Sequence, residues 1–306
     1  MLRSPLTPMA HCPGKSTWRR TVALTPSRYA GYTGDAYALE SVIGKGAFGL
    51  VTLMRSESSG RLVAMKTVDR FRLTSPVLRS AVEKEIRILE QLPPHPGVVP
   101  LVEVIENIRS IHIVLEYCNS GDLQSLVARV GPLDESCARP LAEQLAEAVA
   151  HLHDHRVAHR DLKLDNCVLN LLGSEGGVPL PRYRLRIIDF GLSTIWKEGG
   201  PPLKKLVGSL CYVAPEVLAR SYYGAQADAW SLGCCIAGML GGALPFLASD
   251  EETLRSKVCA GDYELPTRAD LSPESLDLVQ GLLTVRPTER LTIDAVRKHA
   301  WFRACP

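Results

Sequence analysis

The chain has 306 residues and a formal charge of +2, with 46% hydrophobic and 22% charged residues. These proportions are ordinary for a soluble globular protein with a large core, and they exclude an intrinsically disordered chain. Residues 1–34 hold five basic and no acidic residues, whereas the other 272 residues hold 30 basic and 33 acidic residues. A body with that balance has no basic field for nucleic acid, so we expect no nucleic-acid partner.

The first 35 residues are rich in Pro, Ser, Thr and Arg and show no helical or strand period. We predict a disordered basic extension over residues 1–35. A transit peptide is the alternative, because residues 1–34 are basic, hydroxyl-rich and free of acid. Prolines at positions 5, 8 and 13 interrupt the amphipathic helix that such a peptide needs. Organelle targeting by residues 1–34 stays open beside the cytoplasmic and nuclear locations that we expect.

Alternating apolar runs from Tyr37 to residue 69 predict strands, and turn residues at 58–60 separate two of them. An apolar spacing of i, i+4, i+7 predicts a helix over residues 76–92. Two more strand patterns, VVPLVEVIEN and IHIVLEY, follow, and after residue 121 the pattern becomes mostly helical. We predict an α+β chain with a β-rich N-lobe over residues 36–116, a hinge over 116–121, a helical C-lobe over 122–302 and a tail over 303–306.

Two features of the sequence could be mistaken for a membrane span and a disulfide or zinc framework. Residues 229–249 carry no charge and are long enough to span a bilayer. Four glycines and a proline favour instead a buried helix in a soluble domain, so we expect no membrane span. The nine cysteines are odd in number and form no C-x-x-C pair, so neither a disulfide framework nor a zinc site is predicted.

A glycine-rich turn, GKGAFG at residues 44–49, lies between two strand patterns. Glycines let a backbone approach phosphate oxygens, where a Cβ atom would clash. An extended run follows it, whereas a dinucleotide-binding fold opens a helix at that point. Lys66 ends the next strand, and Glu85 on the predicted helix is a partner that would hold its ammonium on phosphates. Glu83 is a competing partner, but it lies off that helix face.

Residues 159–166 read HRDLKLDN, and IIDFG at residues 187–191 places Asp189 at the end of an apolar strand. Asp and Asn supply the hard oxygen ligands that Mg²⁺ takes when phosphates fill its other positions. We therefore predict Asn166 and Asp189 as the metal ligands. A solvated charged loop is the alternative for residues 159–166.

The ordered series of these motifs resembles the eukaryotic protein kinases over residues 37–302. The series comprises GKGAFG, VAMK, EIRIL, VLEYC, HRDLKLDN, DFG, APE, DAW and VRPTERLTIDAVRKHAWF. In carrying Lys163 two residues after Asp161, the chain resembles the Ser/Thr kinases. The segments GSLCYVAPEVL and ERLTIDAVRKHAWF look most like the calcium/calmodulin-dependent kinase group.

The resemblance implies a two-lobed kinase fold that binds ATP and Mg²⁺. The glycine-rich turn would cover the phosphates, adenine would lie between Val51 and Ala64 above and Val168 below, and Leu115 would guard the back of the pocket. Backbone groups of the hinge would bond the adenine edge. The implied nucleotide-binding residues are Ile43, Gly44, Lys45, Gly46, Ala47, Phe48, Gly49, Val51, Ala64, Lys66, Leu115, Glu116, Cys118, Asp122, Val168 and Asp189.

The same resemblance implies the catalytic roles. Asp161 would accept or orient the proton of the substrate hydroxyl, and Lys163 would steady the transferred phosphoryl group. Ser209 would bond both of them, and Arg290 would pair with Glu216. The implied catalytic set is Asp161, Lys163, Asn166, Lys66 and Glu85.

The expected substrates are Ser and Thr residues of proteins, and the expected oligomeric state is a monomer. Asp122 and Asp165 match acidic positions that attract an arginine three residues before the acceptor in related kinases, so we expect a modest preference for one upstream basic residue. Gly238 stands where kinases that prefer a second arginine carry a glutamate.

Lys205 stands at the position where many relatives carry a phosphorylated threonine. We therefore expect activity without phosphorylation of the activation loop. The spacing of 28 residues from Asp161 to Asp189 is wider than is usual in the family, which predicts a lengthened surface hairpin over residues 170–184. The alternative to an active enzyme is a catalytically silent pseudokinase scaffold.

Overall fold

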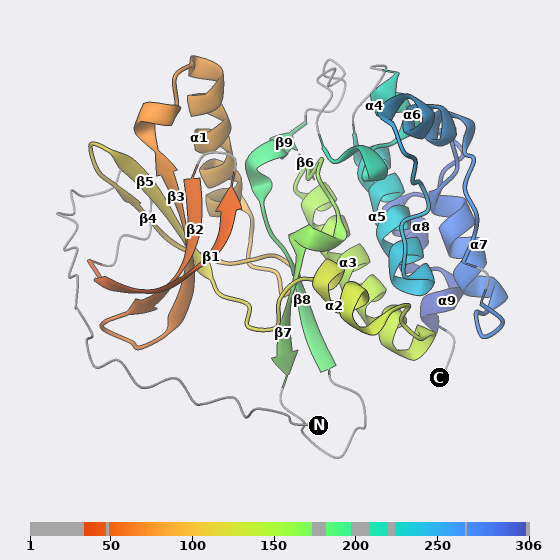
Figure 1. Ribbon diagram of the computed structural model, residues 1–306, viewed down its shortest axis with the longest axis horizontal. Helices are drawn as coiled ribbons and strands as arrows, with labels where there is room; N and C mark the ends of the chain where they lie inside the picture. The colour runs from red at the N-terminus through yellow and green to blue at the C-terminus, as the bar shows by residue number, and fades with distance from the viewer. Residues whose placement is uncertain are drawn as a thin grey trace, which may run out of the picture.

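The computed structural model describes residues 34–46, 49–172, 182–196, 208–219, 224–266 and 268–303. These residues form a β-rich lobe with one long helix and a second, mainly helical lobe, joined by the chain that follows β5 (Figure 1). This arrangement confirms the predicted α+β class. Residues 1–33 of the extension predicted over residues 1–35, the centre of the predicted hairpin (173–181), Lys205 and the last three residues lie outside the described residues.

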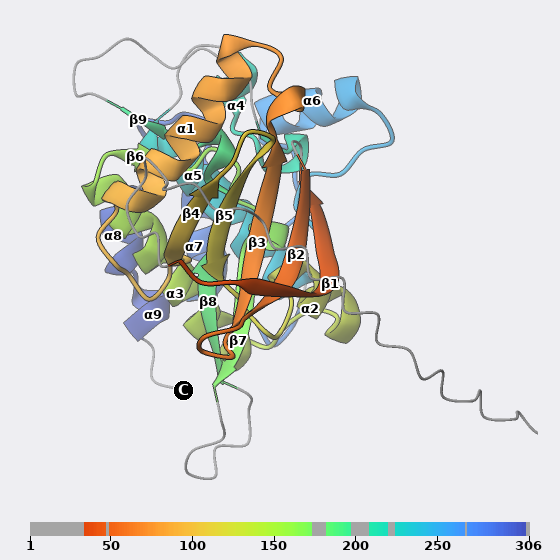
Figure 2. The same ribbon diagram turned by 90° about the vertical axis from the view of Figure 1, so that its left-hand side faces the viewer.

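The N-lobe is a five-stranded antiparallel sheet in the order β1-β2-β3-β5-β4, with helix α1 beside it (Figure 2). The α1 helix begins after Ser75, whose hydroxyl accepts a hydrogen bond from the Leu78 amide, and Pro76 occupies its first turn. The elements of this lobe are β1 (Tyr37–Gly46), β2 (Gly49–Ser56), β3 (Leu62–Asp69), η1 (Arg70–Arg72), α1 (Pro76–Gln91), β4 (Leu101–Glu106) and β5 (Ser110–Glu116).

The strand register decides which side chains share a face of this sheet. Val51 lies opposite Lys66, and Ala64 lies opposite Leu115. Because side chains two residues apart on a strand point the same way, Val51, Ala64, Lys66 and Leu115 share one face. Val63 and other residues of opposite parity form a small separate core on the other face. The register therefore gathers the predicted adenine and phosphate residues on one side.

The C-lobe contains the remaining described helices and two short two-stranded antiparallel sheets, one a hairpin of consecutive strands and the other a pair of strands distant in the sequence. Its elements are α2 (Leu123–Val130), α3 (Glu135–Asp154), β6 (Val157–Ala158), η2 (Leu164–Asn166), β7 (Cys167–Leu172), β8 (Arg182–Ile187), η3 (Phe190–Leu192), β9 (Thr194–Ile195), η4 (Leu210–Tyr212), α4 (Pro215–Leu218), α5 (Ala225–Gly241), α6 (Glu251–Ala260), α7 (Pro273–Leu282), α8 (Ile293–Arg297) and α9 (Ala300–Arg303).

Helix α5 contains the first part of the uncharged stretch and is buried around its circumference from Ala227 to Leu240, except at Ser231. It packs against α3, α7 and α8, so its apolar surface is covered by protein. Within the described part of the chain, no helix combines the length and apolarity needed to cross a bilayer.

Glu135, the first residue of α3, joins three helices of the C-lobe. Its carboxylate accepts hydrogen bonds from the backbone and hydroxyl of Ser272, before α7, and from the Trp301 indole on α9. Burial alone would raise the pKa of Glu135, but these hydrogen bonds outweigh it and lower the pKa from 4.5 to about 2. The folded state therefore favours the charged carboxylate.

We expect Glu135→Gln to lower the free energy of unfolding at pH 7 by about 1 kcal/mol, because a neutral acceptor replaces a charged one. A group whose pKa is depressed on folding stabilises the protein above its unfolded pKa, and this contribution is lost as pH falls from about 4.5 towards 2. In urea unfolding experiments from pH 7 to pH 3, the free energy of unfolding should therefore fall less steeply with decreasing pH in the variant than in the native chain. Glu143→Gln, at an exposed position of the same helix, is the control. An equal pH slope in Glu135→Gln and the native chain would contradict this role.

Candidate active site

Lys66 on β3 contacts carboxylates from both lobes. Its Nζ atom lies 2.6 Å from Oε1 of Glu85 on α1 and 3.0 Å from Oδ1 of Asp189 after β8. The Glu85 side chain is buried, whereas that of Asp189 is 48% exposed. Burial alone would lower the pKa of Lys66, but the two carboxylates outweigh it and raise the pKa above 10.5. The ammonium is therefore charged and fixed at the boundary between the lobes.

The backbone around Asp189 is held in an uncommon conformation. Asp189 has φ 62°, in the left-handed region, which is uncommon for a non-glycine residue. The next residue, Phe190, is buried and packs edge-on against the ring of His159, with the ring centroids 5.2 Å apart. His159 Nε2 in turn lies 3.0 Å from the Ile188 carbonyl oxygen. These contacts hold Asp189 so that its carboxylate reaches Lys66.

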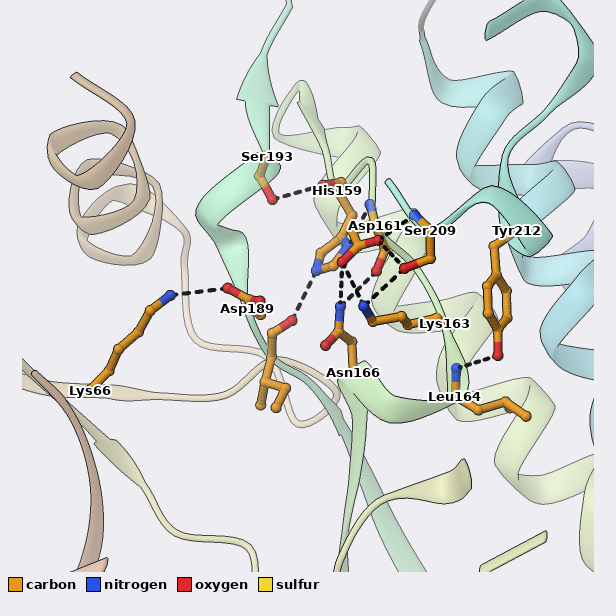
Figure 3. Close-up of polar contacts among 11 residues, drawn as sticks. Lys66, His159, Asp161, Lys163, Leu164, Asn166, Asp189, Ser193, Ser209 and Tyr212 are labelled. Carbon is orange, nitrogen blue, oxygen red and sulfur yellow. Dashed lines mark hydrogen bonds and ion pairs between the residues drawn. The ribbon is translucent and has the colours of Figure 1, made fainter. Parts of the chain in front are cut away.

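Asp161 lies at the centre of a hydrogen-bond network in the C-lobe (Figure 3). Its Oδ1 atom accepts from the backbone and hydroxyl of Ser209, at 3.0 and 3.1 Å. Its Oδ2 atom accepts from Nδ2 of Asn166 at 3.2 Å and lies 3.1 Å from Nζ of Lys163. Lys163 also donates to the Ser209 hydroxyl at 3.0 Å, so the predicted contacts of Ser209 are present. The network orients both carboxylate oxygens of Asp161.

Asp228, near the start of α5, holds the backbone of the two residues that precede Asp161. Its carboxylate accepts hydrogen bonds from the backbone amides of His159 and Arg160, both at 2.9 Å, and lies 3.0 Å from His153 Nε2. Burial alone would raise the pKa of Asp228, but these partners hold the pKa below its usual range. Sequence reasoning did not assign this role, although a lone carboxylate beside an uncharged apolar run already required buried partners.

Gly208 allows Ser209 to reach Asp161. It has φ 101°, and a Cβ atom at this position would lie 2.7 Å from the Arg160 carbonyl oxygen. Any other residue would therefore displace the backbone that carries Ser209. Arg160 itself has φ 70°. Residues 159–166 and the segment before η4 thus approach each other through Arg160 and Gly208, both with positive φ.

The glycine-rich turn lies at the end of β1 and the start of β2, and Ala47 and Phe48 lie outside the described residues. A Cβ atom on Gly49 would lie 1.7 Å from the Thr67 carbonyl oxygen of β3. Among the described residues, a Cβ atom on Gly44 would meet Val51 at an ordinary 3.6 Å. Packing within the sheet therefore requires glycine at position 49, and the described packing imposes no such requirement at Gly44. Ile43 and Lys45 are exposed on β1, which ends at Gly46.

The residues predicted to surround adenine come from both lobes. Val51, Ala64 and Leu115 share one face of the N-lobe sheet, and Val168 lies on β7 of the C-lobe. Glu116 ends β5, and Cys118 follows it in the hinge. Asp122 bridges to Val168 and also caps α2, since its carboxylate accepts from the Ser125 amide at 2.7 Å. The sheet register therefore groups Val51, Ala64 and Leu115 on one face, and the bridge joins Asp122 to Val168 where the hinge enters the C-lobe.

The residues predicted to bind Mg²⁺ fit a hard divalent cation. Asn166 donates both of its side-chain hydrogen bonds through Nδ2, to the backbone and side chain of Asp161, so its Oδ1 atom is the available ligand. Asp189 is half-exposed, and burial, which would raise its pKa, is outweighed by Lys66, which lowers the pKa. An amide oxygen and an ionised carboxylate are ligands that Mg²⁺ accepts together with phosphates.

Glu216 on α4 and Arg290 make the predicted ion pair. Two guanidinium nitrogens of Arg290 lie 2.7 and 2.8 Å from the two carboxylate oxygens, and both side chains are buried. The pair attaches the APE segment to the C-lobe behind Ser209. Lys205 lies outside the described residues, so the prediction about the activation loop stays a prediction.

Comparison with known proteins agrees with this geometry. The protein kinase domain family matches residues 37–302. The chain is 38% identical to CBL-interacting serine/threonine-protein kinase 8 of Arabidopsis thaliana, over 87% of this chain and 57% of that protein. It is 34% identical to the carbon catabolite-derepressing protein kinase of Secale cereale and 35% identical to the SNF1-related protein kinase catalytic subunit alpha KIN12 of Arabidopsis thaliana, in each case over 87% of this chain and 51% of the relative.

The chain thus spans about half the length of the curated relatives that it matches. These relatives are Ser/Thr protein kinases and related kinases, and the predicted likeness to the calcium/calmodulin-dependent kinase group stays a prediction. The family match covers the sheet of the N-lobe, the lysine–carboxylate contacts between the lobes and the Asp161 network. On this evidence the chain belongs to the protein kinase family.

Proposed function

We propose that the chain is an ATP-dependent protein serine/threonine kinase. The observation that carries the proposal is the pair of contacts from Lys66 Nζ, to Glu85 at 2.6 Å and to Asp189 at 3.0 Å. These contacts support the proposal, because they bring the lysine proposed to bind phosphate beside a carboxylate proposed to bind metal, near Asp161 (Figure 3). Phosphoryl transfer depends mainly on such positioning and charge neutralisation.

In the proposed mechanism, the oxygen of a Ser or Thr hydroxyl bonds to the γ-phosphorus of ATP as the bond from that phosphorus to the β–γ bridging oxygen breaks. Asp161 orients the hydroxyl and receives its proton. Lys163, 3.1 Å from Asp161, places a positive charge beside the transferred group. Asn166 and Asp189 would hold Mg²⁺, which neutralises phosphate charge when bound. ADP and the phosphorylated residue are the products.

A pseudokinase scaffold is the rival proposal. Such a protein would normally lack one of Lys66, Asp161, Asn166 or Asp189, and the chain has all four. Their contacts with Glu85 and Ser209 support an assembled site. Because Lys205 stands where many relatives carry a phosphorylated threonine, we also propose that the kinase is active without phosphorylation at the usual activation-loop position. The proposed location is cytoplasmic or nuclear, and the proposed state is a monomer.

The test uses phosphatase-treated chain from a bacterial host, incubated with Mg-ATP and a positional peptide array. We expect phosphate on Ser and Thr peptides, little on Tyr peptides, and a modest enrichment of Arg or Lys three residues before the acceptor. The enrichment follows from exposed Asp165 and half-buried Asp122 near the Asp161 loop. Asp189→Ala is the matched inactive control.

Failure of the native chain to phosphorylate any peptide would contradict the kinase proposal. Activity that appears only after a phosphate is mapped to Ser193, Thr194 or Ser209 would contradict the proposed independence from phosphorylation. Phosphorylation of peptides with no enrichment of Arg or Lys three residues before the acceptor would contradict only the upstream preference. The three outcomes are therefore distinguishable.

A further inference from the structure

The segment that joins the lobes is attached to the β7–β8 hairpin of the C-lobe. The Ser120 amide donates to the Leu169 carbonyl at 2.9 Å, and the Leu169 amide donates to the Gly121 carbonyl at 2.8 Å. Asn170 adds side-chain bonds, accepting from the Asn119 amide at 2.9 Å and donating to Cys118 Sγ at 3.5 Å. The hairpin therefore holds the C-terminal half of the hinge through directed hydrogen bonds.

The N-terminal half of the hinge is held differently, by a buried charge. Arg186 on β8 places Nη1 2.9 Å from Oε2 of Glu116, and its side chain is only 9% exposed. Its Nε and Nη1 atoms make no hydrogen bond of good geometry within the described residues, so the contact with Glu116 is an ion pair without a directed bond. A buried guanidinium needs an anionic partner, and Glu116 is the partner that the structure supplies.

The position of Arg186 relates this ion pair to the predicted adenine site. Arg186 lies directly opposite Val168 in the β7–β8 register, so the two side chains share one face of the hairpin. Val168 is the predicted floor under adenine, and Glu116 and Cys118 carry the backbone groups predicted to bond its edge. The charges of both Arg186 and Glu116 also act on the pKa of the Cys118 thiol, which burial raises to about 11.

We infer that Arg186 is a positioning residue for nucleotide binding, which holds the hinge backbone at Glu116 at a set distance from the Val168 floor. This inference rests on the proposed function. The described contacts of Arg186 include neither Lys66 nor Asp161 nor Asp189, so its effect should fall on adenine affinity rather than on phosphoryl transfer. Because Glu116 is 26% exposed and can be hydrated, loss of the pair should loosen the hinge without unfolding the chain.

The experiment measures adenosine binding to the full chain by calorimetry, together with KM for ATP, kcat on a Ser/Thr peptide and the melting temperature. In Arg186→Met we expect adenosine affinity to fall and KM for ATP to rise, each by about tenfold, which is the effect of about 1.4 kcal/mol, with kcat within twofold of the native value. Arg186→Lys should recover most of the affinity. Arg182→Met, at an exposed position on the same face of β8, is the matched control.

Glu116→Gln tests the same pair from the hinge side if Arg186→Met does not fold. The double variant should bind adenosine no more weakly than the weaker single variant, because both changes remove one interaction. A lower melting temperature with unchanged adenosine affinity and unchanged KM would overturn the inference and leave Arg186 a structural residue. Adenosine binding without peptide phosphorylation by the native chain would count against the kinase proposal and not against this one.

Discussion

Asp161→Asn should lower kcat for peptide phosphorylation by about a thousandfold, as expected when a general base is lost. The substitution keeps the shape of the side chain but replaces one acceptor oxygen with an amide NH2 group, which can only donate. Both oxygens of Asp161 accept hydrogen bonds, from Ser209 on one side and Asn166 on the other, with Lys163 Nζ 3.1 Å away. Either orientation of the new amide therefore places a donor against donors, and the proton of the substrate hydroxyl loses its acceptor.

The measurement is steady-state kinetics with a Ser/Thr peptide, beside the affinity for ATP and the melting temperature. ATP affinity should change by less than about threefold, because phosphate and adenine contacts are assigned to other residues. Asp154→Asn, an exposed change at the end of α3, controls for the loss of one negative charge. Native kcat in Asp161→Asn would refute the role of this carboxylate. An equal loss of ATP binding and turnover would indicate misfolding instead.

The motif order along the chain was sufficient to predict the two-lobed α+β fold and the pairing of Lys66 with Glu85. Each prediction depended on information local to a segment, such as strand alternation, helix periodicity and the two-residue offset that places Glu83 off the helix face of Glu85. The helix predicted over residues 76–92 is α1 at Pro76–Gln91, because Ser75 and Pro76 mark its start in the sequence itself. Such local chemistry is readable without knowing the tertiary structure.

Long-range polar contacts could be predicted only where the family resemblance implied them, as for Arg290 with Glu216 and Ser209 with Asp161. The carboxylate of Asp228 accepts hydrogen bonds from backbone amides about 70 residues earlier in the sequence. Arg186 contacts Glu116 across a similar separation in the sequence. The requirement for glycine at position 49 could not be read from the motif. It arises only when β2 and β3 pair, which brings the Thr67 carbonyl oxygen against the position of a Cβ atom on residue 49. In each case the residue type signalled a constraint, but the partner depended on how the lobes pack.

Removal of Arg290 from its ion pair with Glu216 should destabilise the protein strongly, because it leaves a buried charge without its partner. Both side chains are almost completely buried, at 0% and 6% exposure. Arg290 also donates to the carbonyl oxygens of Thr284 and Val285, at 2.9 and 3.2 Å, and its guanidinium lies 5.1 Å from the centre of the Trp230 ring. Removal of one partner leaves a buried charge whose hydration was lost on folding.

Arg290→Met should therefore lower the free energy of unfolding by about 3–5 kcal/mol, the range seen when one member of a buried ion pair is deleted. Arg286→Met is the matched control, because Arg286 pairs with Glu289 at 2.9 Å on the surface, where such a pair contributes less than about 1 kcal/mol. Denaturant unfolding at pH 7 measures both. Adding Glu216→Gln to Arg290→Met should recover part of the loss, since the uncompensated carboxylate is then gone. An equal decrease in the free energy of unfolding in Arg290→Met and Arg286→Met would show that burial does not make this pair more important than a surface pair. The attachment of α4 to the C-lobe would then depend on the apolar contacts of Val217 and its neighbours.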